Sequence, residues 1–354
     1  MPIISEGPGE LGRKFAAEMD RLTWEKVGPM GLENAARNRA LLDRGQSIAA
    51  LRDAPLATGD SAIVIAAGPS IARRDPIRAI KASGYKGAII ATDSAMYYCL
   101  RNGVVPDLVV TVDPNFLRVV RWFGQPNLDD EELHKDDYFR RQDMDASFAD
   151  ELRVNREITE LLRRHGPQMR IALATCASQP VVDRVIETGM RIFWWNPMFD
   201  DPDLPESKTA ALFRSNRLPC INAGGNVGTA CYMIAHAVLG KKRVAVTGMD
   251  LSYYADTPYR NTQYYTDLVE IVGEENLDAV FIKIRNPHLD AWFYTDPAYY
   301  WFREAFLELA ADAECVTYNC TEGGILFGDN VRFAPLADFL RETSKPGTGA
   351  DVAG

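Results

Sequence analysis

The alternation of short apolar runs with helical segments, which begins at Ser61, is the feature that most constrains this fold. The runs are rich in Val, Ile and Ala and have the length of buried strands. Between them, apolar residues recur at three- and four-residue spacing, which indicates helices. Strands that alternate with helices pair in parallel, because each helix returns the chain to the same end of the sheet. The expected strands are SAIVIAA, GAIIAT, DLVVTVD, RIALAT, RIFWWN, RVAVTG, AVFIKI and CVTYN.

This pattern predicts the α/β class, with a Rossmann-like, doubly wound, mostly parallel sheet and an N-terminal helical extension. Residues 8–52 show helical spacing without a strand pattern, and the pair Gly28-Pro29 separates two expected helices. We expect the extension to pack on the sheet domain or on a second copy in a homo-oligomer. The expected division is a helical N-terminal extension over 1–58, a Rossmann-like nucleotide-binding catalytic domain over 59–340 with a helical insertion or lid over 124–168, and a flexible tail over 341–354.

Composition excludes some classes of partner. The formal net charge of −10 argues against nucleic acid, because binding a polyanion requires a basic surface. The six cysteines form no Cys-x-x-Cys pair and the four histidines are scattered, so we expect reduced thiols and no zinc site. The N-terminus lacks an apolar signal core, and no apolar run reaches the roughly 18 residues of a membrane span. A cytoplasmic protein without a transmembrane segment is the expectation.

Polar residues follow several expected strands at the points where the strands end. Gly68-Pro69-Ser70 follows the first strand, and Asp93 and Asp113 follow the next two. Asp250 comes after RVAVTG, and before that strand a glycine turn at 224–228 opens an apolar helix. Ligands of doubly wound sheets bind beyond these strand ends, and glycines let backbone N–H groups reach a phosphate. Each feature alone also fits a turn or a helix cap, but together they favour a nucleotide phosphate site.

Three segments carry a family resemblance: AIVIAAGPSI, IIATDSAMYYCLRNGVVPDLVVTVDP and GGNVGTACYMIAHAVLGKKRVAVTGMDLSYY. They resemble the domain shared by the motility accessory factor (Maf) flagellin glycosyltransferases and the archaeal hydroxymethylpterin diphosphokinases. Near the C-terminus, NCTEGG resembles the Asn-x-Thr-Glu-Gly-Gly segment of the Maf-type proteins. The resemblance spans roughly residues 60–330 and implies a nucleotide-binding transferase.

A more distant likeness is to bacterial sialyltransferases that bind a CMP-sugar. It implies that Ser70 and the Gly68 backbone meet phosphate or ribose, and that Thr229 lies near the phosphate. It also implies Asp250 near the ribose or base, with Tyr253 or Tyr254 near the phosphate. The expected nucleotide-binding residues are Gly68, Pro69, Ser70, Asp93, Ser94, Gly224, Gly225, Asn226, Thr229, Asp250 and Tyr254.

This sequence differs from the sialyltransferases at two places that bear on the metal ion and the general base. Asp93 and Asp113 stand where those enzymes tend to have asparagine, and His288 is out of register with their histidine. Two carboxylates beside a diphosphate would repel it unless a hard cation such as Mg²⁺ lies between them. Alternatively, one carboxylate is the general base toward an acceptor hydroxyl. The catalytic candidates are therefore Asp113, Asp93 and Glu322 of NCTEGG, and the metal candidates are Asp93 and Asp113.

Three functions remain open. The first is a Maf-type glycosyltransferase that moves a sugar, such as a nonulosonic acid, from a CMP-activated donor to a hydroxyl of a flagellin-like protein or a glycan. The second is a Mg²⁺-dependent diphosphokinase that passes pyrophosphate from ATP to a hydroxymethylpterin-like alcohol. The third is a non-catalytic nucleotide- or glycan-binding module. NCTEGG and the preceding helix favour the first, and the acidic strand ends favour the second.

Overall fold

The structure is a computed structural model that describes residues 9–53, 56–135 and 150–344. Its centre is a ten-stranded sheet in the order β1-β6-β5-β4-β3-β2-β8-β12-β13, with β7 paired to β6. All these pairs are parallel, which confirms the predicted α/β, Rossmann-like fold. The strands are β1 Gln46–Ser47, β2 Ser61–Ile65, β3 Ala88–Thr92, β4 Leu108–Thr111, β5 Arg170–Ala174, β6 Arg191–Pro197, β7 Cys220–Ile221, β8 Arg243–Thr247, β12 Val316–Asn319 and β13 Val331–Phe333.

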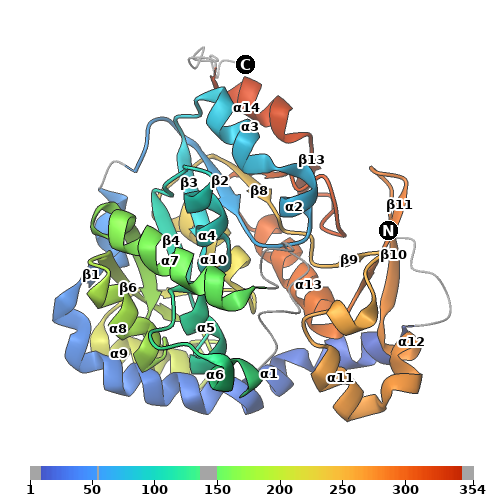
Figure 1. Ribbon diagram of the computed structural model, residues 1–354, viewed down its shortest axis with the longest axis horizontal. Coiled ribbons are helices and arrows are strands. Elements are labelled where there is room, and N and C mark those ends of the chain that lie inside the picture. The colour runs from blue at the N-terminus through green and yellow to red at the C-terminus, as the bar shows by residue number, and fades with distance from the viewer. Residues whose placement is uncertain (1–8, 54–55, 136–149, 345–354) are drawn as a thin grey trace.

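Helices cover both faces of this sheet (Figure 1). All five residues of β2 are buried, and their side chains alternate between two faces, as the period of a strand requires. Ala62 and Val64 belong to a cluster with α10, whereas Ile63 and Ile65 belong to one with α3 and α14. The helices are α1 Glu10–Asn38, α2 Ser70–Arg74, α3 Pro76–Ser83, α4 Asp93–Arg101, α5 Phe116–Trp122, α6 Asp130–Lys135, α7 Glu151–His165, α8 Gln179–Glu187, α9 Lys208–Asn216, α10 Val227–Met233, α11 Tyr265–Val272, α12 Leu277–Val280, α13 Pro297–Ala311 and α14 Leu336–Ser344.

The strand order reverses between β2 and β8. From β2 the chain adds β3, β4, β5 and β6 in one direction, and from β8 it continues through β12 and β13 in the other. At such a reversal the loops leave in opposite directions and open a crevice at the carboxyl ends of the two strands. Two of the sequence-predicted loops, which contain Gly68 and Asp250, follow these two strands.

A small subdomain stands beside the sheet and consists of β9 Tyr253–Tyr254, β10 Ile282–Asn286, β11 Ala291–Thr295, α11 and α12 (Figure 1, orange). Its three strands are antiparallel, in the order β10-β11-β9. The prediction that AVFIKI joins the parallel sheet is therefore wrong. The connection from β10 to β11, residues 287–290, is too short for a crossover, so the two strands form a hairpin.

The predicted boundary of the helical extension at residue 58 also needs correction. Residues 46–47 form β1, which pairs in parallel with β6 at the edge of the main sheet. The following residues Ile48 and Leu51 are fully buried in the main core. A two-residue strand has no periodicity that could reveal it, so the sequence pattern missed this part of the sheet domain.

Within residues 9–38, the break expected at Gly28-Pro29 is absent, since α1 runs continuously through Pro29. Tertiary contacts hold this helix together: Gly31 lies against Phe199 and Cys176, where a Cβ atom would be 3.1 Å from the Phe199 ring. The helix passes beneath both the sheet domain and the small subdomain (Figure 1, blue). Among the described residues, no helix combines the length and apolarity that a membrane span needs.

The expected insertion or lid over 124–168 includes a helix that covers the sheet. Val154, Ile158 and Leu162 of α7 are buried in a cluster with residues of β4 and β5. Their four-residue spacing gives the helix one apolar face, and that face packs on the sheet as in other crossover helices. Residues 136–149 of the expected lid and 345–354 of the expected tail lie outside the described residues.

Candidate functional site

The loops after β2 and β8 meet at the strand-order reversal. The Ser70 hydroxyl donates a 2.6 Å hydrogen bond to Asp250 Oδ2, and the Ser70 backbone N–H lies 3.2 Å from Oδ1. Both residues are buried. Gly68 donates its N–H to the Gly248 carbonyl at 2.8 Å, and a Cβ atom on Gly68 would lie 2.2 Å from Asp250 Oδ2. The loop therefore needs glycine at position 68 so that the aspartate can approach.

The NCTEGG segment after β12 forms a third wall around Asp250. The Ile325 N–H donates to the Asp250 carbonyl at 3.0 Å, and the Met249 N–H donates to Thr321 Oγ1 at 3.2 Å. Gly324 has φ +71°, and a Cβ atom there would lie 2.2 Å from the Asp250 carbonyl oxygen. Close contact with the Asp250 backbone thus explains Gly324, whereas a Cβ atom on Gly323 would lie 2.5 Å from the Tyr254 hydroxyl and 3.0 Å from Asp250 Oδ1.

Glu322, one of the three catalytic candidates, has its side chain engaged elsewhere. Its Oε2 accepts a 3.3 Å hydrogen bond from the Leu336 N–H at the start of α14. A carboxylate at this position stabilises the exposed N–H groups of a helix start. Its backbone carbonyl accepts a 3.1 Å bond from Arg74 Nε. The geometry supports a structural role for Glu322 better than the predicted role of general base.

Tyr254 lies beside Asp250, and Arg73 covers one face of its ring. The guanidinium carbon of Arg73 is 3.9 Å from the centroid of the Tyr254 ring. Burial, followed by the charge of Asp250, raises the pKa of Tyr254 to about 12, although Arg74 and Arg73 act in the opposite direction. The phenol therefore stays protonated near neutral pH and is available as a hydrogen-bond donor.

Asp93 and Asp113 follow the neighbouring strands β3 and β4, as predicted, with Asp93 at the start of α4. Asp93 is buried; its carboxylate accepts a 2.6 Å bond from Thr111 Oγ1 and a 2.7 Å bond from the Ser94 N–H. Burial raises the pKa of Asp93 to about 6, and the charge of Asp113 contributes in the same direction. Asp113 is partly exposed, and its Oδ1 accepts a 2.8 Å bond from the Asn115 N–H. The two carboxylates are thus electrostatically coupled at one sheet edge.

Asp93 and Asp113 could contribute oxygen ligands to a cation such as Mg²⁺, which prefers carboxylates and phosphates. Across the described ranges, no group of three or more His, Cys, Asp or Glu side chains could hold a metal ion. The remaining ligands of such an ion would have to come from a bound phosphate or from water.

The glycine turn at 224–228 begins α10 at the same edge. A Cβ atom on Gly228 would lie 2.2 Å from Met249 Sδ, so the helix start packs beside the Asp250 loop. Asn226 caps the helix by accepting the Thr229 N–H at 2.9 Å and donating to Thr229 Oγ1 at 2.9 Å. Thr229 is fully buried, and Gly225 faces Trp301, whose ring would be 2.4 Å from an added Cβ atom. Packing therefore accounts for Gly225 independently of any phosphate.

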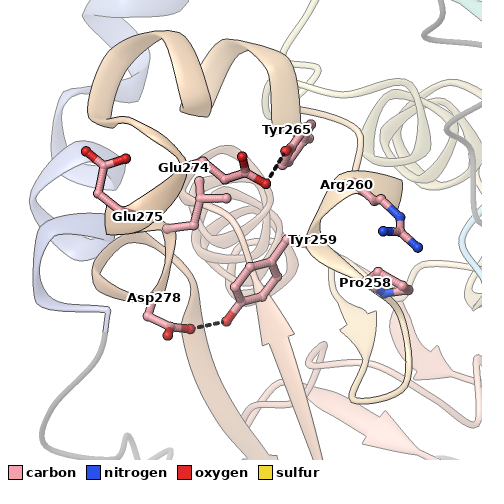
Figure 2. Close-up of a pocket in the computed structure, with 8 residues that line it drawn as sticks. Pro258, Tyr259, Arg260, Tyr265, Glu274, Glu275 and Asp278 are labelled. Atoms are coloured by element: carbon pink, nitrogen blue, oxygen red, sulfur yellow. Dashed lines mark hydrogen bonds between the residues drawn. The ribbon is translucent and has the colours of Figure 1, made fainter.

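A surface hollow of about 340 Å³ lies elsewhere, on the small subdomain (Figure 2). Tyr265 donates to Glu274 at 3.0 Å, and Tyr259 donates to Asp278 at 2.7 Å. None of the sequence-predicted site residues lines this hollow, which is formed by Pro258, Tyr259, Arg260, Tyr265, Glu274, Glu275, Leu277 and Asp278. The strand ends at the β2–β8 reversal, where the buried Ser70 and Asp250 meet, are the better candidate for chemistry, because ligands of doubly wound sheets bind there.

Sequence reasoning missed the part of the N-terminal helix that reaches the site. Asn34 of α1 is buried and donates to the carbonyl of Pro114, the residue that follows Asp113. Asn38, one turn later, donates to carbonyls of the loop after β5. Helical spacing reveals a helix but does not indicate which sheet edge it crosses, so the sequence held no signal for this contact.

Comparison with known proteins identifies one matching family model, described as 6-hydroxymethylpterin diphosphokinase MptE-like, over residues 33–121. That segment contains Gly68–Ser70, Asp93 and Asp113, and the match confirms the predicted resemblance there. No curated protein matches the chain. A similar solved structure is the MAf glycosyltransferase from Magnetospirillum magneticum AMB-1, with 17% identity and a TM-score of 0.48. The alignment covers 82% of this chain and 37% of the other, so this chain corresponds to well under half of that protein.

Proposed function

We propose that this protein is a transferase that binds a nucleotide-activated donor between β2 and β8 and passes a group to an acceptor hydroxyl. The observation that carries the proposal is the Ser70–Asp250 hydrogen bond, which joins two loops at the strand-order reversal. Nucleotides bind at this place in doubly wound sheets, because backbone N–H groups and acidic side chains converge there. The acidic pair Asp93 and Asp113 comes just after β3 and β4, the two strands next to β2 on that side of the sheet.

The roles in this proposal follow from the chemistry of each group. The Gly68–Ser70 loop and the turn at 224–229 face the phosphate, and Asp250 faces the ribose or base. Tyr254 donates its hydroxyl to the phosphate. Asp113 or Asp93 accepts the proton of the acceptor hydroxyl; a carboxylate whose pKa is about 6, as for Asp93, suits a general base near neutral pH.

The first candidate reaction is glycosyl transfer from a CMP-activated sugar, such as a nonulosonic acid, to a protein or glycan. Its support is the NCTEGG segment, which resembles the Maf-type proteins and packs directly on the Asp250 loop. A CMP-sugar carries a single phosphate, so this reaction needs no cation to bridge a diphosphate.

The second candidate is transfer of diphosphate from ATP to a hydroxymethylpterin-like alcohol. Its support is the matched family model, which includes both members of the acidic pair. Asp93 and Asp113 would hold Mg²⁺, which when bound neutralises the diphosphate charge. The chain's own part would then be to orient the donor through the Ser70 loop and to align the acceptor hydroxyl.

A binding panel followed by a transfer assay tests the proposal. We expect CMP or ATP to raise the melting temperature more than CDP, UDP and GDP do, with Mg²⁺ required for ATP. Transfer from a CMP-sugar in the presence of EDTA would establish the first reaction, and Mg²⁺-dependent formation of AMP would establish the second. Binding without either transfer would indicate a non-catalytic module, and no nucleotide binding at all would contradict the proposal.

A further inference from the structure

The last turns of α1 cross the carboxyl edge of the sheet next to Asp113. Asn34, which is 6% exposed, donates both amide hydrogens to backbone carbonyls: to Pro114 at 3.2 Å and to Cys176 at 2.9 Å. These carbonyls belong to loops after two different strands, β4 and β5. A buried carbonyl that lost its donor would carry a desolvation penalty, so these bonds restrict both loops.

The carbonyl on the other side of Asp113 is also held. The Cys176 thiol donates to the Val112 carbonyl at 2.9 Å. Burial, with a contribution from the charge of Asp113, raises the pKa of Cys176, so the thiol keeps its proton and remains a donor. The residues before and after Asp113 are therefore both anchored, one by Cys176 and the other by Asn34. The bond from Asn34 to the Cys176 carbonyl connects the two anchors to each other.

We propose that Asn34 and Cys176 are positioning residues that hold Asp113 in the orientation it needs for group transfer. The inference rests on the proposed function, in which Asp113 acts on the acceptor or on a cation. The bonded carbonyls restrict rotation of the Val112–Asp113 and Pro114–Asn115 peptide planes. The N–H of the second plane, that of Asn115, donates to Asp113 Oδ1 at 2.8 Å, so the direction of the Asp113 side chain is set before substrate binds. Such preorganisation matters because a displacement of about 1 Å at a reacting group costs on the order of 100-fold in rate.

Asn38 offers a matched control on the same helix. It is fully buried and also donates both amide hydrogens to carbonyls, those of Thr175 at 2.8 Å and Ala177 at 2.7 Å. Neither bond reaches residues 112–115. Asn34→Ala and Asn38→Ala should therefore lower the melting temperature by similar amounts. With the donor and acceptor found in the panel above, Asn34→Ala should reduce kcat by about 10–100-fold at unchanged nucleotide affinity. Asn38→Ala, which acts on Asp113 only through the loop that contains Cys176, should reduce kcat by clearly less.

The Asp113→Asn variant distinguishes failure of this inference from failure of the proposed function. If Asp113→Asn turns over like the natural chain, the role proposed for Asp113 is wrong and the inference falls with it, whereas failure of the proposed function itself would appear as absence of nucleotide binding in the panel above. If Asp113→Asn is impaired but Asn34→Ala behaves like Asn38→Ala, the positioning role alone is wrong. If both hold, adding Asn34→Ala to Asp113→Asn should cause no further loss of kcat, because the two changes act through the same carboxylate.

A second pair of variants covers the case in which Asn34→Ala does not fold. Cys176→Ala removes the thiol donor to Val112, whereas Cys176→Ser keeps a donor at that position. We expect Cys176→Ala to lower kcat by about tenfold and Cys176→Ser to restore most of it. Equal kcat in both variants would overturn the role of Cys176.

Discussion

At the scale of single residues, the order of strands and loops predicted which side chains meet at one edge of the sheet, but not what each side chain contacts there. It placed Ser70, Asp93 and Asp250 at one edge because parallel strands share their carboxyl ends, and the structure brings them there. It could not show that Glu322 faces the start of α14, or that Asn34 reaches the loop beyond Asp113. Those contacts depend on packing between segments far apart in the chain, which the local spacing of apolar and polar residues does not reveal.

The raised pKa of Asp93 predicts how stability depends on pH. Because burial raises the pKa of this carboxyl from its ordinary value of 3.8 to about 6, the folded state binds one more proton than the unfolded chain between pH ~4 and ~6. The free energy of unfolding should therefore fall as pH rises through this window. A shift to about 6 corresponds to roughly 3 kcal/mol as an upper estimate.

Asp93→Asn should remove this contribution while keeping an oxygen that accepts from Thr111. Urea unfolding of both proteins at pH 4, 5, 6 and 7 would measure it. We expect the difference in unfolding free energy to change in favour of the variant as pH rises from ~4 to ~6. Asp296, whose pKa burial also raises to about 6, is present in both proteins and cancels in the difference. If the unfolding free energies of the two proteins changed in parallel with pH, the prediction would be contradicted.

At the scale of elements, the sequence predicted the long strands well and the short ones poorly. Seven of the eight expected strands lie in the parallel sheet, since a run such as SAIVIAA reveals burial on both faces. The two-residue strands β1, β7 and β9 have no readable period. In AWFYTDPAYYWF the first residues form β11 and the rest begins α13, because Asp296 caps the helix before Pro297. An aromatic run alone did not distinguish strand from helix.

The glycine turn before α10 gives a prediction at this scale. Gly225 is one of the expected nucleotide-binding residues, but an added Cβ atom at this position would lie 2.4 Å from the Trp301 ring, so a substitution there should affect stability. Gly240 is the matched control, with φ +65° against +79° for Gly225 and nothing within 4 Å of an added Cβ atom. Gly240→Ala should cost about 1–2 kcal/mol through backbone strain alone.

Gly225→Ala should cost a further ~1–3 kcal/mol, because overpacking against the ring adds to the strain. Urea unfolding of both variants measures the difference. Equal losses of unfolding free energy in Gly225→Ala and Gly240→Ala would show that Trp301 moves aside without cost. Loss of nucleotide binding at unchanged stability would indicate that the turn contacts the nucleotide directly.

At the scale of the whole molecule, α1 connects the parts that surround the site. Near its start, Gly9 and Gly12 lie against Ile282 and Val280 of the small subdomain. At its end, Asn34 holds the loops of the main sheet. The small subdomain supplies β9, whose Tyr254 stands beside Asp250, so the position of α1 influences both sides of the crevice. The helical extension, which we expected to pack on the sheet domain or on a second copy, thus packs on both the sheet domain and the small subdomain.

Gly12→Ala tests whether α1 connects these two parts. The answer depends on whether the substitution raises or lowers the free energy of unfolding. In an exposed helix interior, replacing glycine by alanine stabilises by about 1 kcal/mol. Here the new Cβ atom would lie 1.8 Å from the Val280 carbonyl oxygen, so α1 and the small subdomain must separate. We therefore expect a loss of stability, with faster hydrogen exchange in β10 and β11 and unchanged protection in β2–β5. Glu18→Ala, an exposed change on the same helix, controls for effects on α1 alone. Stabilisation by Gly12→Ala, or faster exchange spread evenly over both sheets, would show that α1 does not connect the two parts in this way.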